Sequence, residues 1–494
     1  MASSKKVIVI GAGLGGLSAA IHLAAKGFDV TIIEKNATVG GKMQELRSPN
    51  GYRFDLGPTL ITMPFVFESL FAAAGRKLSD YLELIPLEAS CRYFFQDGTV
   101  FTAYCNRFQF EEEVARVFPS AAPALKPYFD YAKRIYDATA ESFIYNPLSF
   151  SRLFKTNPID LFKIDALSTV HKSNVRFFSD PRFVQFLDRF PTYVGSSPYF
   201  APATLNVIAF VELAFGGFYI KGGMQRLAEA YLKLALELGV TLETNAEVTA
   251  ILDRNKVVTG VQVKKNGAIE TLEALAVVSN DDAIHTYTAL TDKAPKRLKN
   301  LEASCSGYVL TLGVKDTYPN LSHHNIFFTK DYKHEFEEIF TQGVMPSDPT
   351  IYLTRSCHSD AGQSPEGSEN WFLLINAPFL SERYNWKQDG KLYKNLVNES
   401  LEKRGFIGLS GKIEFEAEVT PEMLYQKFYS HRGSIYGLSS NGMMSAFLRP
   451  RNRSPYLKGL YIATGSAHPG GGTPMVTLSG KFAAELLIQD FQEL

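Results

Sequence analysis

The most regular pattern of hydrophobic and polar positions lies within the first 34 residues, where apolar runs flank a glycine-rich turn. Residues 7–10 (Val-Ile-Val-Ile) form a β-branched run that predicts a buried parallel strand. Residues 28–33 predict a second strand. Between the two strands, apolar positions spaced as on one face of a helix occur at Ala19, Ala20, Leu23 and Ala24. The pattern predicts a βαβ unit.

The turn between the first strand and the helix is rich in glycine. It consists of Gly11, Ala12, Gly13, Leu14, Gly15 and Gly16. Gly11 permits a tight turn, Gly13 lets the main chain approach a pyrophosphate, and Gly16 lets the helix pack close to the strand. Glu34 follows the second strand, eighteen residues after Gly16, where a carboxylate accepts hydrogen bonds from a ribose. Glycines at this spacing also occur in ordinary loops, but the order of strand, turn, helix, strand and acid predicts a dinucleotide site.

Further strand and helix patterns, separated by long insertions, predict a discontinuous cofactor domain. They are an amphipathic helix that opens at 222–226, a strand at 241–248, a hairpin at 257–263 and 268–272, strands at 276–280 and 459–465, and a helix from about 477 to 489. The pattern predicts an α/β fold in which a Rossmann-type domain is joined to a discontinuous α+β substrate domain. The cofactor domain is expected at residues 1–75, 221–289 and 451–494, and the substrate domain at 76–220 and 290–450.

Length, charge and cysteine content limit the class of protein. A chain of 494 residues exceeds the size at which a single core keeps growing, which supports two domains. The 51 basic residues balance 51 acidic ones, so electrostatics give no argument for nucleic-acid binding. Four cysteines without CxxC spacing indicate a reducing compartment and no structural metal.

Targeting and membrane-spanning segments are not expected. The first six residues run directly into the first strand, which leaves no room for a signal peptide. The longest apolar passage, residues 205–220, is interrupted by Glu212 and by two glycines and is too short to span a bilayer. A cytoplasmic protein without a transmembrane helix is therefore expected.

The first insertion is dense in aromatic residues. The chain has 37 Phe and 24 Tyr against 2 Trp, a load that suits an ordinary core and also a long apolar ligand. Residues 150–178 interleave Lys155, Lys163, Lys172 and Arg176 with apolar positions. This predicts either a helix lying in a membrane interface or an amphipathic helix packed on its own domain.

The segment after Glu34 resembles the extended motif of FAD-binding amine oxidases and carotenoid desaturases, in which a paired glycine and a basic residue follow the ribose acid. Here the segment contains Lys35, Gly40, Gly41 and Lys42. The resemblance implies that the two glycines bring backbone against phosphate and flavin and that Lys42 adds a positive charge. A flexible turn is the alternative.

The run from Gly465 to Val476 (Gly-Ser-Ala-His-Pro-Gly-Gly-Gly-Thr-Pro-Met-Val) is similar to the signature of the bacterial carotenoid desaturase family, and the resemblance extends over essentially the whole chain. It implies an amine oxidase/carotenoid desaturase-like fold, FAD as cofactor, and an apolar tunnel for a long polyisoprenoid that opens toward the membrane. The amides of a helix beginning at Pro474 would face the flavin ring. Further cofactor contacts implied are Gly57, Pro58, Thr59, Val248, Gly465, Gly472, Pro474, Met475 and Val476.

The resemblance implies a reaction that needs little acid–base machinery. A hydride would pass to the flavin and a proton would leave the adjacent allylic carbon, and a delocalised polyene cation makes that proton acidic. Catalysis would then depend on positioning and on exclusion of water. Arg53, Asp55 and His468 are the catalytic candidates, with turn chemistry or structural hydrogen bonding as the alternative.

Residues 468–476 of the closing run depart from the phytoene desaturase pattern and resemble branches of the family that act late in the pathway. Residues 325–328 and 366–372 resemble the hydroxycarotenoid 3,4-desaturases of bacteria that make monocyclic carotenoids, which predicts a 1-hydroxycarotenoid substrate of the hydroxy-γ-carotene or hydroxylycopene type. The alternatives are a diapocarotenoid terminal oxygenase, a phytoene or dehydrosqualene desaturase, an amine oxidase-like flavoenzyme and a non-enzymatic flavin-binding escort. The expected partners are the carotenoid, the inner face of the cell membrane as its reservoir, and quinone or oxygen as electron acceptor.

Overall fold

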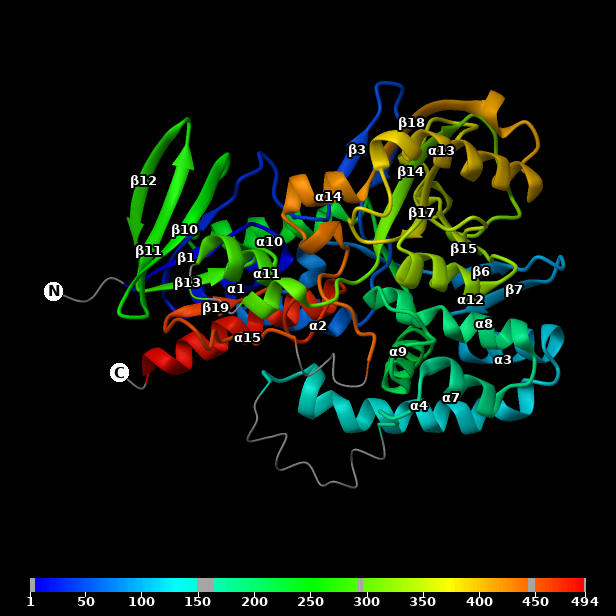
Figure 1. Cartoon of the computed structure of the whole chain (residues 1–494), viewed down its shortest axis with the longest axis horizontal. Helices are drawn as coiled ribbons and strands as arrows, with labels where there is room; N and C mark the ends of the chain where they lie inside the picture. Colours follow the sequence, from blue (N-terminus) through cyan, green and yellow to red (C-terminus); the bar gives the residue numbers. More distant parts are fainter. Residues whose placement is uncertain (1–4, 149–163, 292, 294–295, 443–448, 493–494) are drawn as a thin grey trace.

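The structure is a computed structural model that describes residues 5–148, 164–291, 293, 296–442 and 449–492. Two sheets organise it (Figure 1): a five-stranded sheet in the half that carries both termini, and a seven-stranded sheet in the other half. The chain passes between the two halves several times, because each sheet takes strands from segments far apart in the sequence. The expected domain boundaries stay a prediction.

The five-stranded sheet is parallel throughout and contains the predicted βαβ unit. Its order is β19-β13-β1-β2-β9. The strands are β1 (Lys6–Ile10), β2 (Asp29–Ile33), β9 (Thr241–Glu243), β13 (Ala276–Ser279) and β19 (Leu460–Ile462). The predicted strands from both ends of the chain are thereby confirmed as members of one sheet, in which β13 lies between β1 and β19. The carboxyl ends of β1, β13 and β19 meet at one edge, where ligands bind in sheets of this kind.

One predicted strand, residues 241–248, is wrong as a single element. The structure divides it into β9 in the parallel sheet and β10 in an antiparallel sheet. Asn245 lies between the two strands with a φ of 53°, a left-handed conformation that turns the chain out of the first sheet. The antiparallel sheet contains β10 (Ala246–Arg254), β11 (Val257–Lys265) and β12 (Ala268–Glu273), which confirms the predicted hairpin.

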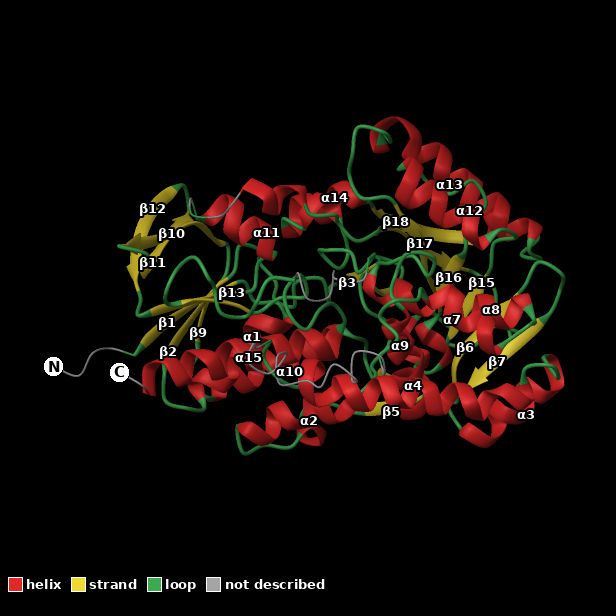
Figure 2. Ribbon diagram, turned by 60° about the horizontal axis from the view of Figure 1, so that its bottom comes forward, coloured by secondary structure: helices red, strands yellow, loops and turns green. Residues whose placement is uncertain are grey.

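Helices pack against the parallel sheet and on one another (Figure 2). They are α1 (Leu14–Ala24), α2 (Pro64–Ala73), α10 (Gln225–Glu237) and α15 (Thr473–Gln492). In Figure 2, α2 lies beyond α1 and α15. The last helix begins four residues before the predicted Thr477, because Pro474 fits the first turn of a helix. Helices α1 and α15 cross closely: a Cβ on Gly480 would lie 2.3 Å from the carbonyl oxygen of Gly15.

The seven-stranded sheet has the order β18-β14-β17-β16-β15-β6-β7 and is antiparallel except between β15 and β6. Its strands are β6 (Ala89–Phe94), β7 (Val100–Tyr104), β14 (Ser306–Val314), β15 (His324–Phe327), β16 (Ile351–Thr354), β17 (Glu369–Ala377) and β18 (Ile413–Val419). Two short ribbons join the halves, β3 (Glu45–Arg47) with β4 (Arg53–Asp55) and β5 (Leu84–Pro86) with β8 (Phe218–Ile220).

Helices pack around the larger sheet, many of them on its lower side in Figure 1. The described α-helices of this half and of its connections are α3 (Arg107–Val117), α4 (Leu125–Thr139), α7 (Val170–Phe177), α8 (Pro181–Asp188), α9 (Asn206–Phe215), α11 (Ala283–His285), α12 (Tyr332–Glu337), α13 (Trp386–Lys403) and α14 (Pro421–Phe428). Within the described ranges, no helix combines the length and the apolar character needed to cross a bilayer.

The aromatic-rich insertion forms the core between these helices and the sheet. Fully buried members include Tyr128, Phe178, Phe183, Phe186 and Phe190. The interpretation of these rings as an ordinary core is therefore confirmed. Of the predicted interfacial helix at residues 150–178, the part up to residue 163 lies outside the described residues, and the rest contains α7.

Candidate functional site

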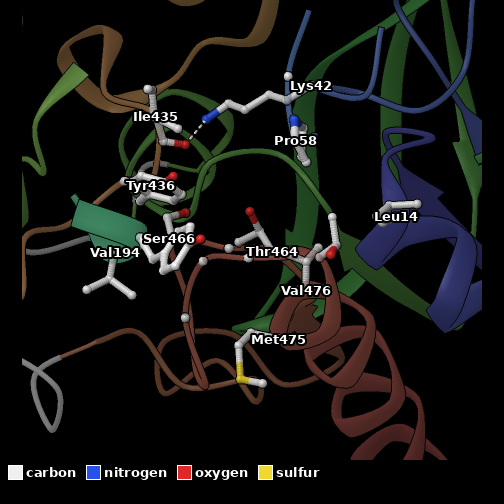
Figure 3. Close-up of a pocket in the computed structure, with 18 of the residues that line it drawn as sticks. Leu14, Lys42, Pro58, Val194, Ile435, Tyr436, Thr464, Ser466, Met475 and Val476 are labelled. Carbon is white, nitrogen blue, oxygen red and sulfur yellow. Dashed lines mark hydrogen bonds between the residues drawn. The ribbon is translucent and has the colours of Figure 1, made fainter. Parts of the chain in front are cut away.

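A cavity of about 900 Å³ extends from the carboxyl edge of the parallel sheet to the inner face of the seven-stranded sheet. One end is lined by the glycine-rich turns and the other by apolar side chains. Figure 3 shows part of its wall, with Leu14 of α1 on one side and Tyr436, Thr464 and Val476 on the others. Every predicted cofactor contact except Ala12, Gly15 and Gly16 lines this cavity.

The first glycine turn is tightly constrained by its neighbours. Gly11 has a φ of +88°, and a Cβ on Gly16 would lie 2.2 Å from the carbonyl oxygen of Gly11. A Cβ on Gly13 would lie 2.4 Å from Oδ1 of Asn280, which follows β13. Gly13 is also the N-cap of α1 and has no side chain, so no side chain caps this end of the helix, which faces the cavity and suits an anion.

Glu34 lies at the end of β2 and is buried. Its carboxylate accepts hydrogen bonds from the amides of Ala12 and Asn36, each at 2.8 Å, and from Nδ2 of Asn36 at 2.8 Å. An ionised carboxylate has about four acceptor positions, so one remains for a ribose hydroxyl. The side chain thus connects the glycine turn to the sugar end of the cavity.

The second glycine pair is packed on the first. Gly13 and Gly40 form a parallel bridge, and the Gly40 amide donates to the carbonyl of Ala12 at 2.8 Å. A Cβ on Gly57 would lie 2.1 Å from the carbonyl oxygen of Lys42. Because the Gly40-Gly41 segment is held by main chain on both sides, the flexible-turn interpretation is wrong.

Lys42 places a cationic group against the middle of the cavity. Its Nζ donates to the carbonyl oxygens of Ile435 at 2.5 Å and Ser434 at 3.3 Å (Figure 3). Burial lowers the pKa of Lys42 to about 8, with Asp282 opposing that shift. An anionic ligand beside Nζ would restore the preference for the charged form.

The sugar end of the cavity also contains Lys35 and Val248. Nζ of Lys35 lies 3.3 Å from the ring centroid of Tyr429, a cation–π contact. The Tyr429 hydroxyl donates to Glu247 at 2.5 Å, next to Val248 of β10. Sequence analysis did not identify Tyr429, because its partners come from segments far away in the chain.

The closing run forms a glycine turn that leads into α15. Gly472 has a φ of +102°, and the Val476 amide donates to its carbonyl at 2.9 Å. A Cβ on Gly465 would lie 3.1 Å from Cγ2 of Val476. Tyr436, a residue that sequence analysis missed, packs against this turn: a Cβ on Gly471 would lie 2.7 Å from its ring.

The three catalytic candidates do not line the cavity. His468 is fully buried, lies 2.9 Å through Nε2 from the carbonyl oxygen of Asn146, and stacks on Phe482. Arg53 and Asp55 form a buried ion pair at 2.9 Å, and Asp55 accepts the Met224 amide that begins the connection to α10. These contacts favour the structural interpretation, and the catalytic roles stay a prediction. Burial lowers the pKa of His468 to about 4.

The far part of the cavity has many apolar side chains in its wall and also contains a group of polar ones that contact each other. Apolar lining residues include Val207, Ile208 and Val211 of α9, Val309 of β14, Ile326 of β15, and Phe372 and Leu374 of β17. The polar group comprises Arg189, Tyr193, Glu212, Thr59 and Tyr352. Of these, sequence analysis singled out Thr59 as a cofactor contact and Glu212 as an interruption of an apolar run.

The donors and acceptors present fit a flavin dinucleotide. The N-terminus of α1 suits phosphate, Glu34 suits a ribose, and Lys42 with the first turn of α15 suits the electron-rich edge of a flavin ring. A parallel α/β sheet with such a site and an attached apolar chamber is typical of a dinucleotide-dependent oxidoreductase.

Comparison with known proteins places the chain in a family. Residues 14–282 match the family described as flavin-containing amine oxidoreductase, and the chain belongs to it. It is 38% identical to a 4,4'-diapolycopene oxygenase of Methylomonas sp. over 99% of both chains, and 36% identical to a 4,4'-diaponeurosporene oxygenase of Staphylococcus aureus over 98% of both. The protein is thus an FAD-dependent oxidoreductase.

Solved structures share the fold at low sequence identity. Putrescine oxidase bound to putrescine has a TM-score of 0.64 at 14% identity, with 99% of each chain covered. Cyclohexylamine oxidase from Brevibacterium oxydans has a TM-score of 0.64 at 16% identity, again with 99% of each chain covered. These similarities confirm the amine oxidase-like fold with an α/β cofactor domain.

Proposed function

We propose that this protein oxidises the end group of a long acyclic carotenoid, in the manner of a diapocarotenoid terminal oxygenase. The observation that carries the proposal is the continuous cavity, in which the flavin site opens into an apolar chamber between α9 and strands β14 and β17. Relatives whose names specify diapolycopene and diaponeurosporene oxygenation support this choice over near full length.

The side chains that line the cavity indicate what this protein contributes to the reaction. FAD, when bound, accepts a hydride from carbon and passes electrons to an acceptor, for which oxygen or a quinone is proposed. Gly13, Glu34, Lys42 and the first turn of α15 would hold the cofactor, while the aromatic and aliphatic wall excludes water and aligns the polyene.

A second candidate is 3,4-desaturation of a 1-hydroxycarotenoid. Two segments favour it, residues 325–328 and 366–372, because they resemble the hydroxycarotenoid desaturases. They contain the strand positions Ile326 and Phe372, whose side chains line the chamber. The two candidates differ in product: oxygenation adds an oxygen atom, whereas desaturation lengthens the conjugated system without adding one.

We further propose that the chamber takes its substrate from a membrane surface. Exposed apolar side chains occur next to lining positions: Leu167 beside Ala166, Phe200 near Pro202, and Phe65 near Met63. Such side chains suit contact with lipid at the inner face of the cell membrane. Binding of the holoprotein to liposomes, lost on replacing Leu167 and Phe200 by serine, would support this part of the proposal.

The test is a substrate panel with purified holoenzyme. 4,4'-Diapolycopene, 1-hydroxy-γ-carotene, lycopene, phytoene and putrescine are supplied in turn, and products are identified by absorbance and mass with oxygen uptake. A terminal aldehyde formed with oxygen consumption is expected. A product with a longer conjugated system and no added oxygen would favour the desaturase. Oxidation of putrescine would favour an amine oxidase, and an unchanged flavin spectrum at saturating polyene would favour a binding protein.

A variant with a bulky side chain in the chamber tests where the polyene reacts, with a matched control elsewhere on the protein. Val211→Trp places an indole in the chamber and is expected to lower polyene turnover at least tenfold while flavin content stays unchanged. Leu236→Trp, at an exposed position of α10, is the control and keeps full activity. Full polyene turnover by the Val211→Trp variant would show that the reaction occurs elsewhere.

A further inference from the structure

A buried ion pair with unused hydrogen-bond donors lies in the wall of the apolar chamber. Nη2 of Arg189 donates to Oε1 of Glu212 at 2.5 Å, and the Tyr193 hydroxyl donates to Oε2 of Glu212 at 2.6 Å. The side chains of Arg189 and Glu212 are only 5% and 2% exposed. The pair comes from the end of α8 and the middle of α9, which the fold brings together at the cavity.

Arg189 is short of acceptors. A guanidinium has five N–H donors, yet in the described part of the chain its only hydrogen bond is the one to Glu212, and Nε is buried without a partner. Burying a charged group without full hydrogen bonding is costly. A hydrocarbon in the chamber accepts no hydrogen bond and would leave the donors of Arg189 unpaired, whereas an oxygen atom of the ligand would accept from them and lower this cost.

The guanidinium is held in place by aromatic rings. Its carbon lies 4.2 Å from the ring centroid of Phe190, 5.0 Å from that of Tyr193 and 5.4 Å from that of Tyr93. These contacts fix the position of the donors, so a ligand would not have to order a flexible side chain.

A second polar chain faces the same part of the cavity. The Thr59 and Tyr352 hydroxyls are 2.7 Å apart, and the Tyr352 hydroxyl lies 2.8 Å from Nδ1 of His324. Burial, assisted by the charge of Arg189, lowers the pKa of His324 to about 3, so its ring is neutral at physiological pH. Thr59 follows Pro58 in a segment assigned to the cofactor, which places this polar chain beside the flavin end of the chamber.

We propose that Arg189, held by Glu212 and flanked by Tyr193 and Tyr352, binds the oxygen atom of a neutral carbonyl or hydroxyl group at the end of the polyene. Because Glu212 balances the charge of Arg189, the site favours a neutral oxygen over a carboxylate. This inference rests on the proposed function and deepens it: the enzyme binds the alcohol or aldehyde form of its substrate more tightly than the hydrocarbon.

The test compares matched polyenes on chemically reduced holoenzyme without oxygen, because a reduced flavin accepts no hydride and the ligands stay unchanged. The ligands are 4,4'-diapolycopene, its mono-aldehyde and its mono-acid, and the dissociation constants are read from polyene absorbance. The aldehyde is expected to bind about tenfold or more tightly than the hydrocarbon, since its oxygen gains a charge-assisted hydrogen bond, and more tightly than the acid. This comparison needs no variant.

A charge-neutral double variant assigns the preference to the pair. Arg189→Met with Glu212→Gln removes both charges together and avoids a single unpaired charge. We expect its preference for the aldehyde to fall to within about twofold while hydrocarbon binding is unchanged. Lys394→Met with Glu416→Gln, which removes an ion pair outside the cavity, is the control and keeps the preference.

The outcomes separate this inference from the function on which it rests. Equal binding of hydrocarbon and aldehyde by the wild type, or an unchanged preference in the folded Arg189/Glu212 variant, overturns the end-group site alone. A flavin-loaded wild type that binds none of the polyenes overturns the proposed function together with it.

Discussion

At the scale of single residues, the site separates groups that face the cavity from groups that only support it. Lys42 and Arg189 point cationic atoms at the cavity, and the shortage of acceptors around Arg189 identifies it as a ligand-binding group. His468 is different, because its ring lies between Phe143 and Phe482 and its Nε2 is paired with a carbonyl. A histidine in a glycine-rich signature is thus a packing residue here.

The assignment of His468 predicts a pH effect on stability. Its pKa falls from 6.5 to about 4 on folding, mainly because burial disfavours the charged ring. Between these two pKa values the unfolded chain therefore binds more protons than the folded one. The contribution of neutral His468 to the free energy of unfolding is complete above pH 6.5 and is lost as the pH falls toward 4. The loss amounts to at most about 3 kcal/mol.

His468→Gln tests this, because glutamine retains a donor for the Asn146 carbonyl and does not titrate. The free energy of unfolding, measured with urea between pH 4 and 7, should fall less steeply in the variant than in the wild type. Some slope remains because burial also lowers the pKa of His22 and His324. His334→Gln, at an exposed position, is the control. If the His468→Gln variant folds normally but substrate no longer reduces its flavin, the result would support the catalytic interpretation of His468.

At the scale of elements, the short strand β4 joins the two halves of the molecule through one buried ion pair. Asp55 accepts from Arg53 and from the Met224 amide at the start of α10. Gly223 makes this contact specific, because a Cβ there would lie 1.9 Å from Nη1 of Arg53. Two of the catalytic candidates, Arg53 and Asp55, therefore help to dock a strand on a helix.

Asp55→Asn is predicted to be strongly destabilising. The change removes one of the two carboxylates, Asp55 and Glu45, that pair with the buried guanidinium of Arg53. Breaking a buried pair outright typically costs about 3–5 kcal/mol, which is the upper bound here. Urea unfolding followed by circular dichroism measures the loss. Asp130→Asn, which breaks an exposed pair with Lys126, should give no measurable change. Equal stability of the Asp55→Asn variant and the wild type would mean that the ion pair contributes little to docking.

At the scale of the whole molecule, the cofactor site is assembled from segments hundreds of residues apart. Lys42 contacts Ile435, 393 positions later, and Gly15 lies under α15 near the C-terminus. A ligand that bridges such segments binds the folded chain and not the unfolded one, so it should stabilise the entire fold.

Flavin should therefore raise the melting temperature of the whole protein. Free FAD at a hundred times its dissociation constant adds about 2.7 kcal/mol to the free energy of unfolding of flavin-depleted protein. The melting temperature should continue to rise with FAD concentration. Differential scanning calorimetry measures this effect. NAD is the control, because the Lys42 segment suits a flavin. An equal rise with NAD, or none with FAD, would contradict the cofactor assignment.

The sequence by itself determined the parts of this protein that depend on local backbone chemistry. The turn at Gly11 and the pair Gly40-Gly41 have positive φ angles of 88°, 104° and 58°, which glycine adopts without steric cost, so these turns are visible in the sequence. The βαβ unit, the hairpin of β11 and β12, and the acid at Glu34 follow from hydrophobic periodicity and short spacings for the same reason.

Only the tertiary structure decided which distant side chains meet. Arg189 and Glu212 are 23 positions apart, and Thr59 and Tyr352 are 293 apart. Periodicity places each of them on an element, yet their contact depends on how α8, α9 and the seven-stranded sheet pack. The same packing turned His468, Arg53 and Asp55 away from the cavity, because the burial and hydrogen bonding of a side chain are set by neighbours that lie far away in the sequence.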